Sequence, residues 1–137
     1  MNLTLHATPE EVMRAVEALQ KFEQGQGLSE KTIFGLSLAL EECGSNIVNH
    51  ALQRDPQKTF RVSFERAGDV FVIELRDSGP PFDPTAAPVR APQADDDLPG
   101  GWGIQLVRRH TDEMIYRREG DENVLRLVKK ILSAPEK

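Results

Sequence analysis

Hydrophobic residues recur every three or four positions along the first third of the chain, which predicts two amphipathic helices. The Thr8-Pro9 pair is typical of a helix start, with Thr8 as the cap, and Ser29 is expected to cap the second helix. The apolar positions are Val12, Val16 and Leu19 in the first helix, then Ile33, Leu36, Leu40, Cys43, Ile47 and Ala51 in the second.

From residue 60 the period of the pattern changes to two, which predicts strands with one buried face. The alternating apolar positions are Phe60, Val62 and Phe64, then, after a turn, Phe71, Ile73 and Leu75. A short helix is expected at about 103–110, further strands at about 114–118 and 124–131, and a short edge strand at 3–6. This order predicts an α+β fold in a single domain, residues 1–137. We expect a two-layer α/β sandwich whose mixed, mostly antiparallel sheet carries helices on one face.

Composition and charge narrow the classes of function. The chain has 17 basic and 22 acidic residues, a net charge of −5, which disfavours nucleic-acid binding. The single cysteine, Cys43, excludes an internal disulfide and a cysteine-rich zinc site. The N-terminus lacks the basic and apolar regions of a signal peptide, and no apolar run reaches the roughly 18 residues of a membrane span. We therefore expect a cytoplasmic protein.

The second predicted helix carries a cluster of poor helix formers in its middle, at residues 44–50. Glu42 and Asn46 are four residues apart, so they lie on one helix face, and His50 continues that row. An amide oxygen is a suitable ligand for Mg²⁺, and a carboxylate one turn away can accept a proton from a nucleophile. The alternative is a solvated helix face with local side-chain hydrogen bonds.

A second candidate group follows the predicted strand at residues 71–76. Asp77 has the same parity as the apolar positions of that strand, so it is expected to point toward the core at the strand end. A carboxylate there can accept a hydrogen bond from an exocyclic amine such as that of adenine, and Gly79 allows the backbone to approach a ligand closely. The alternative is an ordinary turn, because Asp-Ser-Gly-Pro is a common turn sequence.

The third candidate group is the sequence PGGWGIQLV. Residues 78–101 show no period, and a loop of this length in a compact domain is typically functional or disordered. The free N–H groups of a helix N-terminus bind phosphate, and glycines such as Gly101 and Gly103 let the backbone curl around it. Glycine-rich loops also occur simply to release the chain from a lid. Arg108 and Arg109 are expected at the surface, with partner binding as a second interpretation.

The order of these three groups resembles that of a known superfamily. Glu42-x-x-x-Asn46, Asp77-x-Gly79 and Gly101-x-Gly103 resemble the N box, G1 box and G2 box of the GHKL ATPases. Within it, the chain is similar to the small anti-sigma factor serine kinases of bacterial partner switching. This likeness covers nearly the whole chain, and its segments are EECGSNIVNHA, DSGPPFDP, GGWGIQLVRRHTDEMIY and NVLRLVKK. Pro81 is a departure, because the G1 box often has a second glycine there.

The resemblance implies the Bergerat ATP-binding fold, with ATP and Mg²⁺ as ligands. It makes Glu42 the general base and Asn46 the ligand of a Mg²⁺ ion that bridges the phosphates. It makes Asp77 the acceptor for the adenine amine, and the segment at about 84–100 the ATP lid. The implied nucleotide-binding residues are Asn46, Asp77, Gly79, Gly101, Gly103 and Ile104.

The expected function is that of an ATP-dependent serine/threonine protein kinase acting as an anti-sigma factor. It would phosphorylate a small antagonist protein and sequester a sigma factor. The alternative is a binding module that holds ATP as a switch without phosphoryl transfer. The catalytic domain of a histidine kinase is disfavoured, because we find no helix pair with a phosphoacceptor histidine. The expected partners are proteins, a second copy of the chain among them, and not nucleic acid or membrane.

Overall fold

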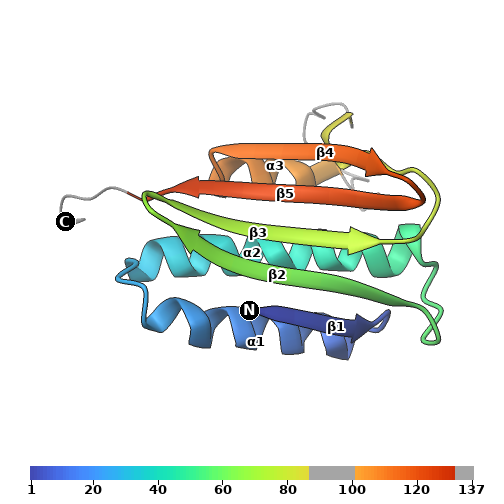
Figure 1. Cartoon of the computed structure of the whole chain (residues 1–137), viewed down its shortest axis with the longest axis horizontal. Coiled ribbons are helices and arrows are strands. Elements are labelled where there is room, and N and C mark those ends of the chain that lie inside the picture. Colours follow the sequence, from blue (N-terminus) through green and yellow to red (C-terminus); the bar gives the residue numbers. More distant parts are fainter. Residues whose placement is uncertain (87–100, 132–137) are drawn as a thin grey trace.

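The computed structural model describes residues 1–86 and 101–131. Its five strands form one sheet in the order β1-β2-β3-β5-β4 (Figure 1). The strands are β1 (Asn2–His6), β2 (Thr59–Ala67), β3 (Val70–Asp77), β4 (Glu113–Glu119) and β5 (Glu122–Lys130). The predicted edge strand and the hairpin are confirmed. All strand pairs among the described residues are antiparallel, so the sheet is not mixed.

The helices begin at the predicted caps. Thr8 Oγ1 accepts a hydrogen bond from the N–H of Glu11 at 3.2 Å, and Ser29 Oγ accepts one from the N–H of Thr32 at 3.1 Å. These bonds satisfy N–H groups that have no partner within a first helical turn. The helices are α1 (Pro9–Gln24), α2 (Glu30–Asn46), the π-helical turn η1 (Ile47–Ala51), the 3₁₀ turn η2 (Pro84–Ala86) and α3 (Gly101–His110).

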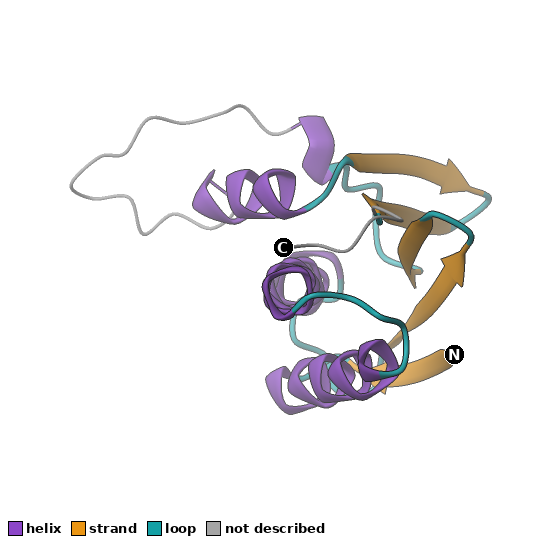
Figure 2. Ribbon diagram, turned by 90° about the vertical axis from the view of Figure 1, so that its left-hand side faces the viewer, coloured by secondary structure: helices purple, strands orange, loops and turns teal. Residues whose placement is uncertain are grey.

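The α-helices cover one face of the sheet, with α2 between α1 and α3 (Figures 1 and 2). The buried core lies between these two layers and includes Phe60, Phe64 and Phe71 from the strands, with Leu19 and Leu40 from the helices. The predicted two-layer α/β sandwich is therefore confirmed. In the part of the chain that the structure describes, no helix is both long and apolar enough to cross a membrane.

The second helix departs from the prediction after Asn46, where the α-helix gives way to η1. The N–H of Leu52 bonds to the carbonyl of Ile47 at 2.8 Å, which is the i→i+5 bond of a π-helix. This wider turn coincides with the cluster of poor helix formers, which favour the α-helix less than the residues before them. Within this turn, the His50 ring stacks against Phe82 with centroids 6.1 Å apart.

The third helix starts two residues earlier than predicted. Gly101 and Gly103 lie inside the first turn of α3, not in a loop before it. Glycine has low helix propensity, but at Gly103 it allows α3 to approach the Glu42 side chain of α2 closely. A Cβ atom at Gly103 would overlap the carboxylate of Glu42. Tertiary packing therefore decides the start of this helix.

Candidate functional site

A narrow cavity of about 20 Å³ lies between the end of α2 and the end of β3. Its apolar walls include Ile47, Leu75 and Leu125, and its polar groups are Asn46, Asp77 and Asn123. Phe82 and Pro84, from the segment after β3, also line it. A cavity of this size holds about one water molecule. A larger ligand would therefore require the segment after β3 to move.

Asn46 occupies the cavity wall formed by α2. Asn46 is only 6% exposed, and its carboxamide makes no hydrogen bond to any residue that the structure describes. The carboxamide lines the cavity, so a ligand in the cavity can bond to it. Its amide oxygen suits Mg²⁺. Among the described residues, no cluster of three or more acidic, histidine or cysteine side chains could hold a metal.

Asp77 lies at the opposite wall, at the C-terminal end of β3. It is 5% exposed, so its predicted inward direction is confirmed. Its Oδ1 accepts hydrogen bonds from the N–H of Gly79 at 2.8 Å and from Nδ2 of Asn123 at 3.0 Å. Oδ2 remains as the oxygen that can accept from a ligand. Gly79 is required by sterics, because a Cβ atom there would lie 2.5 Å from the carbonyl oxygen of Ala51.

Asn123 is a site residue that the sequence reasoning missed. It is 4% exposed, and besides Asp77 its Nδ2 donates to the carbonyl of Pro80 at 2.9 Å. Its Oδ1 accepts from the Tyr116 hydroxyl at 2.5 Å and from the Phe82 N–H at 3.2 Å. The signal was present in the sequence, because Asn123 has the same parity on β5 as the apolar Leu125 and Leu127. A polar residue at an inward position of a strand indicates a buried partner.

Glu42 lies one turn before Asn46 on α2, but it lines a different space. We call this space the α2–α3 hollow: it measures about 200 Å³ and is lined by Glu42, Gly103, Gln105, Leu106 and Arg109. Burial raises the pKa of the half-buried Glu42 carboxyl, the Glu41 carboxylate raises it further, and His50 lowers it. The four residues from Glu42 to Asn46 correspond to about 6 Å along a helix axis. The two spaces are therefore neighbours along α2.

The remaining predicted nucleotide contacts lie at the start of α3. Gly101 begins the helix, and the side chain of Ile104 is 3% exposed, in the protein interior. Only the backbone amide of Ile104 is then available to a ligand, as one of the free N–H groups of a first helical turn. Residues 87–100, which form most of the predicted ATP lid, lie outside the described part of the chain. Of the lid, the structure describes η2 alone.

The chain matches a known family. The model of the histidine kinase-like ATPase domain matches residues 5–129, so the chain belongs to that family. It is also 32% identical over 105 residues to the serine/threonine-protein kinase BtrW of Bordetella bronchiseptica. That alignment covers 75% of this chain and 72% of BtrW.

Two solved structures share the fold at low sequence identity. One is the SiaB–SiaC complex from Pseudomonas aeruginosa, with a TM-score of 0.69 and 15% identity over 93% of this chain and 88% of that chain. The other holds the RsbU and RsbW domains of Rv1364c from Mycobacterium tuberculosis, with a TM-score of 0.64 and 16% identity. The match covers 95% of this chain but only 32% of the mycobacterial chain.

Proposed function

We propose that this protein is an ATP-dependent protein kinase that phosphorylates a serine or threonine of a small antagonist protein. The observation that carries the proposal is the position of Glu42, on the helical turn before Asn46 and against the first turn of α3. Membership of the histidine kinase-like ATPase family supports the use of ATP. The name of the relative BtrW, a serine/threonine-protein kinase, supports a hydroxyl as the acceptor.

In this proposal Glu42 is the general base. Its carboxylate makes no hydrogen bond to a described residue, so it is available to take the proton of an incoming hydroxyl. A raised pKa makes the carboxylate a stronger base, and burial is the main cause of that rise. Phosphoryl transfer depends mostly on positioning and electrostatics, and a carboxylate can orient or deprotonate the nucleophile.

The nucleotide would be held by the cavity between α2 and β3 and by the start of α3. Asp77 would accept a hydrogen bond from the adenine amine through Oδ2, and the amide oxygen of Asn46 would ligate Mg²⁺. When bound, Mg²⁺ supplies positive charge that offsets the charge of the phosphates. The first N–H groups of α3 and Gly103 would lie toward the phosphates.

We extend the proposal to a sigma factor as the second partner, which the protein would sequester. This extension rests on the sequence resemblance to the anti-sigma factor kinases. The alternative function is an ATP-binding switch that regulates a partner without phosphoryl transfer. The small volume of the cavity favours this alternative. A nucleotide would have to displace Phe82 and Pro84, and ATP binding would then be coupled to a change of shape.

The experiment that separates these functions uses Glu42→Gln with Glu41→Gln as a matched control on the same helix. Transfer from γ-labelled Mg·ATP to candidate antagonist proteins is measured together with Mg·ATP affinity. We expect Glu42→Gln to retain affinity and to slow transfer about 10²–10⁴-fold, as for loss of a general base. Glu41→Gln removes a neighbouring negative charge but leaves the Glu42 carboxylate in place, so its effect on transfer should be small beside that of Glu42→Gln. If wild type labels no candidate and Glu42→Gln changes nothing, the switch function replaces the kinase function.

A further inference from the structure

Glu42 borders a space that the nucleotide cavity does not include. The cavity contains Asn46 and Asp77, whereas the α2–α3 hollow contains Glu42, Gly103 and Arg109. With about 200 Å³, the hollow has room for one or two side chains. Because Gly103 also lines the hollow, phosphates held at the start of α3 would lie at one end of it, and a hydroxyl in the hollow could meet Glu42 there.

We propose that the α2–α3 hollow binds the serine- or threonine-bearing segment of the acceptor protein, with the hydroxyl toward Glu42 and an acidic side chain toward Arg109. This inference rests on the proposed kinase function and adds to it where the acceptor docks and which chemistry it carries.

We call the line of contact between α2 and α3 the seam. Its geometry places Glu42 and Arg109 on one surface. Glu42 meets Gly103 at one end of the seam, and Gly35 meets His110 at the other, where a Cβ at Gly35 would lie 2.5 Å from His110 Nδ1. The helices therefore run antiparallel, and Arg109 lies beside the Gly35 end. An incoming segment along this seam would touch both Glu42 and Arg109.

The charge of this surface favours an acidic segment. Arg109 is exposed and makes no ion pair with any residue that the structure describes. Burial lowers the pKa of His110, and the charges of Arg109, Lys129 and Lys31 lower it further. Three cations therefore lie near His110, and one of them, Lys129, is paired with Asp112 at 3.9 Å. The planar guanidinium of arginine can bind a carboxylate through two parallel hydrogen bonds.

The apolar part of the surface supplies area for a protein partner. Phe34, next to Gly35 on α2, is 63% exposed, and Leu106 in the hollow is half-buried. Exposed aromatic residues and arginine are the residue types that contribute most to protein–protein binding. We therefore expect the acceptor segment to carry an apolar residue as well as an acidic one.

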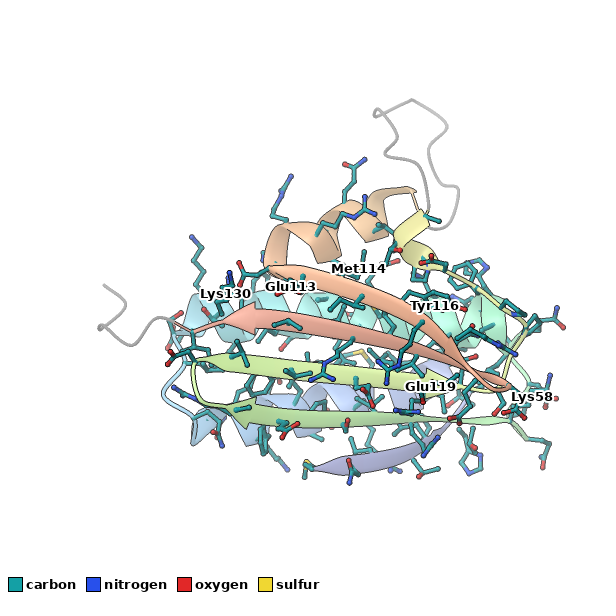
Figure 3. All side chains as sticks on the ribbon, turned by 45° about the horizontal axis from the view of Figure 1, so that its top comes forward. Lys58, Glu113, Met114, Tyr116, Glu119 and Lys130 are labelled. Carbon is teal, nitrogen blue, oxygen red and sulfur yellow. The ribbon has the colours of Figure 1, made fainter. Side chains whose placement is uncertain are left out.

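The test compares wild type with Arg109→Glu, and uses Lys58→Glu as a charge-matched control. Lys58 is exposed and lies far from α3, at the start of β2 (Figure 3). The probes are the candidate antagonist proteins and an array of peptides with a central serine or threonine and acidic, neutral or basic flanks. Label transfer from γ-labelled Mg·ATP and Mg·ATP affinity are both measured.

We expect wild type and Lys58→Glu to prefer acidic flanks. Arg109→Glu should lose at least tenfold in transfer to acidic acceptors, through KM, and gain preference for basic flanks, with Mg·ATP affinity within twofold of wild type. Transfer that is the same in wild type and Arg109→Glu overturns the docking site but leaves the kinase function intact. If Arg109→Glu loses as much Mg·ATP affinity as it loses transfer, Arg109 belongs to the nucleotide site instead, which overturns the docking site. Absence of transfer by wild type to every probe overturns the kinase function and this inference with it.

Discussion

At the residue scale, Asn123 links β5 to the turn that follows β3. Its amide can face only one way, because Asp77 and the carbonyl of Pro80 accept hydrogen bonds, whereas the Tyr116 hydroxyl and the Phe82 N–H donate. With the amide fixed, Oδ1 of Asp77 is fixed too. Tyr116, labelled on β4 in Figure 3, makes the adjoining strand part of the same network.

We predict that Asn123→Ala weakens ATP binding about tenfold or more and reduces the preference for ATP over GTP. The substitution leaves the Phe82 N–H and the Pro80 carbonyl without this partner and frees Asp77 to rotate, and each unmade buried bond costs roughly 1–3 kcal/mol. Competition binding with both nucleotides measures this. The exposed Asn49→Ala is the matched control and should change neither value. An unchanged ATP to GTP ratio would show that Asn123 does not position Asp77.

At the element scale, the seam between α2 and α3 depends on Gly103. A Cβ there meets only side-chain atoms of Glu42, so an alanine displaces the carboxylate without shifting a backbone. Gly79 is different, because its Cβ would meet the backbone carbonyl of Ala51. An alanine at Gly103 should therefore change the site, whereas an alanine at Gly79 should change the fold.

We predict that Gly103→Ala lowers phosphoryl transfer at least tenfold without lowering the melting temperature, since alanine favours helix by up to about 1 kcal/mol. Gly79→Ala should lower the melting temperature. Combining Gly103→Ala with Glu42→Gln tests the cause: if Gly103 acts by placing Glu42, the double variant transfers no more slowly than Glu42→Gln alone. If the double variant transfers phosphate more slowly than Glu42→Gln by the full factor seen for Gly103→Ala alone, Gly103 acts on something other than Glu42.

The sequence predicts the elements better than it predicts the contacts between them. The alternation in β2 and β3 suffices for the hairpin and for the inward direction of Asp77, because the side-chain period of a strand is fixed. The role of Asn123 depends on partners as far as 46 residues away along the chain, which no local pattern reveals. The close approach of α3 to α2 at Gly103 likewise depends on packing between helices, not on the residues of each helix alone.

At the scale of the whole molecule, the two faces of the sheet differ. The helices cover one face, while on the other Arg76 bonds to Glu74 and to Glu119, both at 2.9 Å, and these charged side chains lie over Val124, which is 0% exposed. Figure 3 shows Glu119 near the end of β4. Exposed ion pairs contribute roughly 0–1 kcal/mol each. Most of the stability must therefore come from the core between the sheet and the helices.

Within that core Glu23 works against stability at neutral pH. It lies near the end of α1 and is 0% exposed, and neither carboxylate oxygen has a hydrogen-bond partner among the residues that the structure describes. Burial raises its pKa from 4.5 to about 8. The folded protein therefore holds this proton up to about pH 8, whereas the unfolded chain loses it above about pH 4.5. The stability linked to this group is fully present below about pH 4.5 and is lost as the pH rises toward 8.

We predict that Glu23→Gln, which cannot ionise, becomes more stable relative to wild type as the pH rises from 4.5 to 8, with no further gain above pH 8. Burying an unpaired carboxylate costs free energy that the neutral amide avoids, and the gain should be on the order of 2–4 kcal/mol by pH 8. Urea unfolding at pH 4.5, 6, 7 and 8.5 gives the free energy of unfolding for each protein. Glu17→Gln, an exposed position on the same helix, is the matched control, and its difference from wild type should stay constant with pH. A constant difference for Glu23→Gln as well would mean that Glu23 is ionised in the folded protein at neutral pH, so that its carboxylate must find a partner or water in solution.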